Sequence, residues 1–333
     1  MEKLLFTVLL ILVQKKNYII NLIIFCKEIK NERPTNQYTA MRVEVKIQTF
    51  MFRIRYKQSN KSSMKFFIFI FLIGNNVLLY GQTISGIIME KNSNNPVEYV
   101  NIGIVGKNIG TVSDQNGKYI LKIASEYYND TLRFSCIGYH SYSVKISDFI
   151  NLNNGNVNFE KREYELTEVV VRPRRVSEKR LGITTKSKLA VGCFADSING
   201  REIGIIIKNK KTVFLKEVNL NITTCTYDSI FYRINIYKAH NDMQFEDILT
   251  KPIYASSSKE EVEDKITIDL RHLYIKIDSD FLVTFEAVKN LGAGSLCFPA
   301  SLLHKTYVRK TSHGTWETRP AGISISTLVD VEK

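Results

Sequence analysis

The sequence lacks the short motifs that mark the best-known classes of enzyme. It contains no Gly-x-Ser-x-Gly elbow, no phosphate-binding P-loop and no dinucleotide fingerprint. None of its five histidines is followed three positions later by an acid, as the His-x-x-Glu pair of many catalytic zinc sites requires. We therefore predict no catalytic residue, no cofactor and no metal. A glycosidase that uses scattered carboxylates stays open, because such a site has no fixed spacing in the sequence.

Cysteine is scarce, and its spacing excludes zinc-type and CxxC sites. The four cysteines after residue 81 are Cys136, Cys193, Cys225 and Cys297. Four cysteines allow three complete pairings, and the sequence does not choose among them. Cys136 falls on the inward side of a strand pattern, which predicts a free buried thiol. No cysteine closely follows the apolar run before residue 81, so a lipid anchor is not indicated.

No apolar run reaches the roughly 20 residues that a transmembrane helix needs. The run 66–80 follows Met64-Lys65 and precedes Gly81-Gln82. A basic start, a short apolar centre and a small residue before a polar one are typical of a secretory signal. Residues 64–81 are therefore predicted to be a signal peptide. Such a signal would direct the remainder to the periplasm, the outer membrane or the cell surface and would then be removed.

Residues 1–63 do not have the pattern of a domain. We interpret them as an extension that reflects a mis-assigned start, with translation beginning at Met64; a genuine membrane-associated extension is the alternative. The segment carries 12 Lys/Arg and 4 Asp/Glu of a chain whose net charge is +13. Without it and Lys65, residues 82–333 have a net charge of only +4. This balance predicts no nucleic-acid partner.

After Gln82, apolar residues repeatedly alternate with polar ones, and no long helical stripe occurs. A period of two is typical of strands with one buried and one exposed face. The sequence therefore predicts an all-β chain with two β-sandwich domains. The clearest alternating segments are 132–136, 142–146, 218–222, 232–236, 266–270, 281–285 and 323–325.

The first predicted domain, residues 82–171, carries several motifs in order. They are Gly86-Ile87-Ile88, Pro96-Val97-Glu98-Tyr99-Val100-Asn101-Ile102, Gly110-Thr111, Asp114-x-x-Gly117-x-Tyr119, Phe134-Ser135-Cys136-Ile137-Gly138-Tyr139 and Leu166-Thr167-Glu168-Val169-Val170-Val171. With these motifs the domain resembles the carboxypeptidase regulatory-like domain of the Gram-negative envelope. The resemblance implies a seven-stranded Greek-key or prealbumin-like sandwich. The family also precedes the plug of TonB-dependent receptors, but the 162 residues after Val171 are too few for a 22-stranded barrel.

The remainder of the chain is predicted to be a linker and a second sandwich. Residues 172–185 are polar and basic, which favours a solvated linker. An electrostatic contact with anionic envelope surfaces, and so a peripheral association with the outer membrane, is the alternative. Residues 186–333 hold at least eight strand-like runs, which suits a jelly-roll-like sandwich.

The best candidate ligand contacts are Trp316, Tyr307 and Arg309. Trp316 is the single tryptophan of the chain and lies in a predicted hairpin arm. A sugar or peptide could stack on this ring while Arg309 donates hydrogen bonds. The alternative is that Trp316 caps the edge of the sandwich core.

These observations together predict a non-catalytic, secreted envelope protein. It would bind or scaffold a polysaccharide, a peptide or a partner protein. The alternatives are an accessory or catalytic hydrolase with its site in residues 186–333, or a fragment of a TonB-dependent receptor system. Neither the ligand nor the oligomeric state follows from the sequence.

Overall fold

The computed structural model describes residues 81–152, 154–163, 176–195, 199–240, 243–262 and 264–332. All of them belong to one compact unit, Tyr80–Lys333. The predicted extension 1–63 and the predicted signal up to Tyr80 lie outside the described residues. Within the described ranges, no helix has both the length and the apolar character needed to cross a bilayer.

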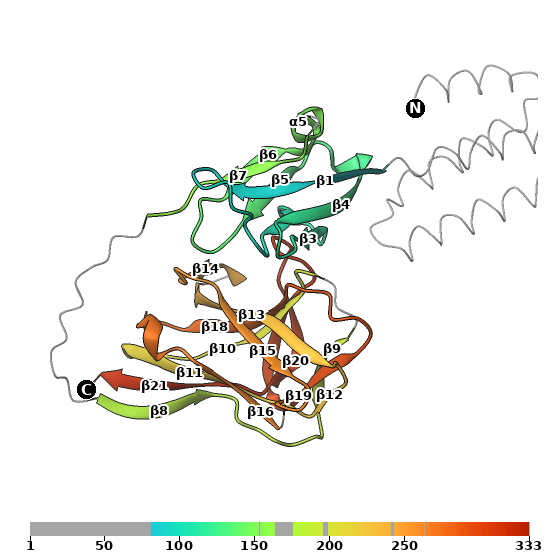
Figure 1. The fold of residues 1–333 in the computed structure, drawn as a ribbon. Helices are drawn as coiled ribbons and strands as arrows, with labels where there is room; N and C mark the ends of the chain where they lie inside the picture. Colours follow the sequence, from blue (N-terminus) through green and yellow to red (C-terminus); the bar gives the residue numbers. More distant parts are fainter. Residues whose placement is uncertain are drawn as a thin grey trace, which may run out of the picture. The chain divides into compact units, whose positions relative to one another are not determined.

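The predicted all-β fold is confirmed, and the first domain consists of two small sheets (Figure 1). One sheet has the order β4-β1-β7 and the other β3-β2-β5-β6. The strands are β1 (Gly81–Glu90), β2 (Asn101–Ile104), β3 (Gly110–Val112), β4 (Lys118–Ala124), β5 (Thr131–Ser135), β6 (Tyr142–Lys145) and β7 (Val157–Phe159). A 3-10 turn, η1 (Ser125–Tyr127), and one short helix, α5 (Ile146–Asn151), complete the domain.

Alternation along the strands produces the core of this domain. In β4, Tyr119, Leu121 and Ile123 are buried while their neighbours in the strand are exposed. The turn before β4 is held by Asp114, whose Oδ1 accepts the backbone N–H groups of Asn116 and Lys118, both at 2.8 Å. Such local side-chain bonds are why aspartate favours turns.

The second domain contains a nine-stranded and a five-stranded sheet. The larger sheet has the path β12-β19-β10-β18-β13-β14, with β15 on β13 and with β9 and β20 on β19; the smaller has the path β16-β11-β21-β8, with β17 on β11. The larger sheet comprises β9 (Val191–Ala195), β10 (Glu202–Ile207), β12 (Thr224–Cys225), β13 (Ser229–Ala239), β14 (Phe245–Asp247), β15 (Ile253–Ser258), β18 (Phe281–Ala287), β19 (Ser295–Arg309) and β20 (Glu317–Ile323). The smaller comprises β8 (Val176–Gly182), β11 (Val213–Asn221), β16 (Lys265–Asp269), β17 (Lys276–Ile277) and β21 (Ile325–Glu332), and a 3-10 turn, η3 (Arg271–Leu273), follows β16.

One hydrophobic core joins these two sheets. It includes Val218 and Leu220 of β11 together with Ile234 of β13 and Phe285 of β18, all fully buried. Burial of such side chains contributes roughly 1.5–3 kcal/mol each. The second domain is therefore a sandwich, as expected, while the jelly-roll pattern of connections stays a prediction.

The predicted linker 172–185 is wrong for residues 176–182. These residues form β8, which pairs antiparallel with β21 at the edge of the smaller sheet. Their side chains are mostly exposed. Glu178 forms an ion pair with Lys216, in which Oε2 lies 2.6 Å from Nζ. An edge strand of this kind is joined to the sheet by backbone hydrogen bonds, so it needs no apolar alternation that the sequence could reveal.

Candidate binding site

The larger sheet has one apolar face and one strongly polar face. Ile203, Ile234 and Phe285 point into the sandwich core, whereas their neighbours in the strands point to the other face. Register places Glu202 of β10 opposite both Glu286 of β18 and Arg309 of β19. Arg233 of β13 lies opposite Glu286, and Asn235 lies opposite Thr284. Strand pairing thus gathers charges that are far apart in the sequence.

Glu286 is the first centre of this polar network. Its Oε2 accepts hydrogen bonds from Nε of Arg233 at 3.0 Å and from Nδ2 of Asn235 at 2.7 Å. Its Oε1 accepts a bond from Oγ of Ser312 at 2.9 Å. Since this side chain is fully buried, these bonds replace the water that the carboxylate loses.

Glu202 is the second centre and is equally buried. Its Oε2 lies 2.5 Å from Nε of Arg309. Its Oε1 accepts bonds from Tyr237 Oη and Asn235 Nδ2, both at 2.9 Å, and from the hydroxyl of Thr284. Asn235 therefore bridges the two carboxylates, and two arginines balance their two negative charges.

This network is suited to stabilising the fold and not to proton transfer. Burial opposes ionisation of Glu286, but the Arg233 and Arg309 guanidiniums and the bonds from Asn235 and Ser312 outweigh it and lower the pKa. A general acid needs a pKa near the working pH and contact with its substrate. The side chains of Glu286 and Glu202 have no exposed surface.

The first domain supplies the remaining partners of Arg233. The guanidinium donates from Nη1 to the carbonyl of Tyr99 at 2.7 Å and from Nη2 to Oδ1 of Asn101 at 2.6 Å. The Tyr99 ring packs on Phe231 and Tyr254, with centroids 5.1 and 5.5 Å apart. Two hydrogen bonds from Arg233 and the packing of Tyr99 on Phe231 and Tyr254 thus couple the two domains.

His313 provides a second link between the domains. Its Nε2 lies 3.2 Å from Oγ of Ser135, and its carbonyl accepts the N–H of Gly106 at 2.9 Å. Burial, together with the nearby charges of Arg309 and Arg133, lowers the pKa of His313 to about 4, against weaker opposing effects of Glu286 and a backbone hydrogen bond with Asn101. The imidazole is therefore neutral near pH 7.

We expect His313 to make the fold sensitive to mild acid. Because its folded pKa of about 4 lies below the ordinary 6.5, its contribution is complete above pH 6.5 and is lost as the pH falls through this interval. The complete loss corresponds to about 3 kcal/mol. Urea unfolding of wild type and His313→Asn at several pH values tests this. The variant should have the flatter stability curve between pH 6.5 and 4; parallel curves would contradict the assignment.

The three predicted ligand contacts lie together in the structure. The Arg309 guanidinium lies 4.7 Å from the Trp316 ring centroid. Phe245 of β14 joins the group, with its centroid 5.1 Å from Trp316 and 6.0 Å from Tyr307. Trp316 also meets Tyr237 edge-on at 6.2 Å. We call Tyr237, Phe245, Tyr307 and Trp316 the aromatic cluster.

The aromatic cluster lies beside the polar network and outside the main sandwich core. Trp316, Phe245 and Tyr307 are partly exposed, whereas Tyr237 is buried. Sequence reasoning missed Phe245 and Tyr237, because they meet Trp316 only through contacts between strands that are separate in the sequence. Arg309 links the polar network to the aromatic cluster, since it pairs with Glu202 and stacks on Trp316.

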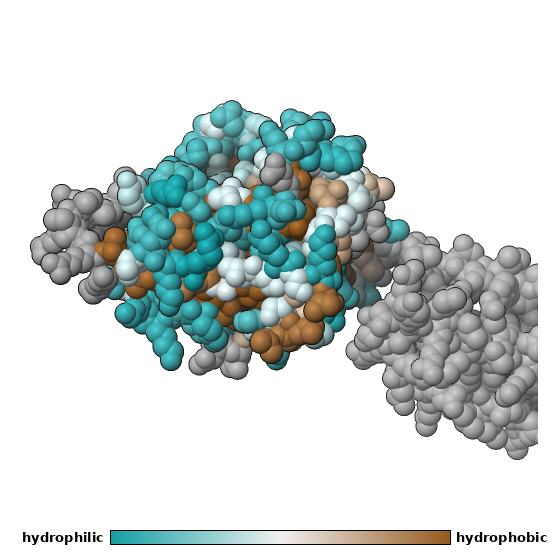
Figure 2. Space-filling view, turned by 90° about the horizontal axis from the view of Figure 1, so that it is seen from below, coloured by the Kyte–Doolittle hydropathy of each residue, from teal (hydrophilic) through white to brown (hydrophobic). Residues whose placement is uncertain are grey.

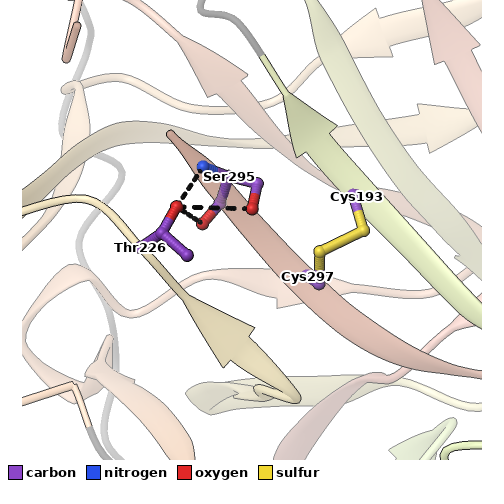
Figure 3. Close-up of a disulfide and its surroundings, with 4 residues drawn as sticks. All are labelled: Cys193, Thr226, Ser295 and Cys297. Carbon is purple, nitrogen blue, oxygen red and sulfur yellow. Dashed lines mark hydrogen bonds between the residues drawn. A yellow bond between two sulfur atoms is a disulfide. The ribbon is translucent and has the colours of Figure 1, made fainter. Parts of the chain in front are cut away.

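The structure selects one of the possible cysteine pairings (Figure 3). Cys193 of β9 and Cys297 of β19 lie opposite each other and form a disulfide. Cys136 and Cys225 are free, so the prediction of a free thiol at Cys136 is confirmed. Burial raises the pKa of Cys136 to about 11, which makes it a poor nucleophile. In the described part of the chain, no group of three or more His, Cys, Asp or Glu side chains is arranged to hold a metal.

Fold and site together define an all-β protein in which the second sandwich domain holds a buried ionic network that the first domain contacts through Tyr99 and Asn101. Residues 84–171 match the family model of the CarboxypepD_reg-like domain, so this part of the chain belongs to that family. Comparison with curated proteins finds no match.

Among solved structures, the chain is similar to one of the infectious bursal disease virus Gx strain, with 12% identity and a TM-score of 0.19 over 75% of this chain and 60% of that one. It is also similar to the VP2 subviral particle of this virus, with 10% identity and a TM-score of 0.15 over 76% and 64%. The chain thus spans less than two thirds of these structures. Similarities this weak support no argument about fold or function.

Proposed function

We propose that this protein is an exported, non-catalytic binding module of the cell envelope. The observation that carries the proposal is the contrast on one face of the larger sheet. There, the carboxylates Glu202 and Glu286 are enclosed by arginines, whereas the rings of Trp316, Phe245 and Tyr307 keep exposed surface. Enclosed carboxylates favour a structural role, and partly exposed aromatic rings suit binding.

The Cys193–Cys297 disulfide supports export. Disulfides form and persist in oxidising compartments and are rare in the cytosol. The predicted signal at residues 64–81 points to the same destination. We infer that residues 82–333 are the mature protein and that they work at the periplasm, the outer membrane or the cell surface.

The proposed ligand is an envelope polysaccharide, and the alternative ligand is a peptide or a partner protein. Sugar rings present apolar faces that stack on aromatic side chains, and Arg309 beside Trp316 can orient their hydroxyl groups. The ionic network would hold the aromatic cluster rigid by fixing Arg309. Rigid sites bind more tightly because less conformational entropy is lost on binding.

Trp316 allows binding to be measured directly, because it is the only tryptophan in the chain. We expect soluble envelope polysaccharide fragments to change its fluorescence and to raise the melting temperature. Replacing Tyr307, which touches Phe245 at the edge of the cluster, with alanine should weaken binding roughly tenfold while leaving the reporter intact.

The matched control for this titration is Tyr274→Ala. Tyr274 is 72% exposed and belongs to no aromatic pair within the described residues. The Tyr274→Ala variant should bind the saccharides like the wild type. No change in fluorescence or melting temperature with any saccharide would overturn the polysaccharide proposal and favour a protein partner. Equal binding by both tyrosine variants would move the site elsewhere.

A further inference from the structure

An irregular segment of β19 turns two leucines outward. The pairing of β19 with β20 shifts register between Ser301 and Lys305, so residues 302–304 stand opposite Ala321 alone. The hydroxyl of Thr306 donates to the carbonyl of Ala321 at 2.7 Å, which fixes the segment at its far side. Extra residues in one strand bend it and redirect its side chains.

The result is a strongly exposed apolar tip. Leu302 is 74% exposed and Leu303 is 92% exposed. Leu189, which is 93% exposed, belongs to the neighbouring segment, because the N–H of Ala300 bonds the carbonyl of Ala190 at 2.8 Å. We call Leu189, Leu302 and Leu303 the leucine tip. On the face drawn in Figure 2, hydrophobic residues form several patches among hydrophilic ones.

The surroundings of the leucine tip are basic. Lys186, Lys188 and Lys305 are exposed and make no ion pair with any described residue. The three chain segments that meet here, 183–194, 296–308 and 318–325, contain no Asp or Glu. Exposed leucines bordered by lysines combine an apolar anchor with a positive charge, which is the pattern of an interfacial membrane contact.

We propose that the leucine tip docks onto the surface of an anionic lipid bilayer. The leucines enter the boundary between headgroups and acyl chains, and the three lysines contact the headgroup phosphates. This surface is made by residues other than those of the aromatic cluster. Its failure would therefore leave the proposed ligand site untouched, and failure of that site would leave the leucine tip untouched.

Vesicle sedimentation tests the proposal with residues 82–333, which include both hydrophobic cores and lie within the single compact unit. The probes are phosphatidylcholine vesicles with and without phosphatidylglycerol. Leu302→Ser/Leu303→Ser should lower binding to the anionic vesicles by at least about tenfold, since two large apolar side chains are lost. Each lysine-to-alanine change should lower it roughly fivefold.

The matched controls come from the first domain, where Ile120 is 69% and Leu152 is 58% exposed. Ile120→Ser and Leu152→Ser should bind like the wild type. Absence of wild-type binding, or equal binding to neutral and anionic vesicles, would overturn the proposal. A concentration-dependent dimer in analytical ultracentrifugation that Leu302→Ser/Leu303→Ser abolishes, without vesicle binding, would instead assign the tip to self-association.

Discussion

Replacing Arg233 with methionine is expected to lower the free energy of unfolding by about 3–5 kcal/mol. The change leaves Glu286 buried without its strongest partner and removes the bonds to Tyr99 and Asn101 of the first domain. Urea unfolding of residues 82–333, followed by circular dichroism and Trp316 fluorescence, measures the loss. We also expect the two transitions to separate, because Trp316 reports only on the second domain.

The matched control is Arg271→Met. Arg271 forms ion pairs with Glu217 and Asp269, but its side chain is 51% exposed. Exposed pairs contribute about 1 kcal/mol or less. A loss for Arg233→Met no greater than for Arg271→Met would contradict the structural role that we assign to the buried network.

Removing the disulfide with Cys193→Ala/Cys297→Ala is expected to cost about 2–5 kcal/mol. The bond joins residues 104 positions apart, and closing so long a loop restricts the unfolded chain most. Thermal unfolding with and without dithiothreitol measures the effect. The reductant should destabilise the wild type and leave the double variant unchanged.

Cys225→Ala is the control for the disulfide, since Cys225 carries a free thiol in the same domain. Its effect should be about 1 kcal/mol at most. After unfolding of residues 82–333, only Cys136 and Cys225 should react with a thiol reagent. Reaction of all four cysteines without a reductant, or a wild type indifferent to dithiothreitol, would refute the pairing.

The signal for the polar network was present in the sequence but incomplete. Arg233 interrupts the apolar strand 229–239, and Glu286 nearly ends the apolar strand 281–287. A charge inside such a strand is almost never buried without a partner. The identity of the partner depends on register, because a slip of one residue would turn Arg233 toward the opposite face.

The local pattern of the sequence determined which segments form strands and to which family the first domain is similar. Alternation of apolar and polar residues predicted the strands and the inward position of Cys136, and the ordered motifs identified the first domain, because each depends on neighbours within a few residues. Tertiary structure alone decided which cysteines pair, that 176–182 form an edge strand, and that Arg309 joins Glu202 to Trp316. Apart from the contact of Arg309 with Trp316, these features depend on residues more than a hundred positions apart, and only the pairing of strands brings such residues together.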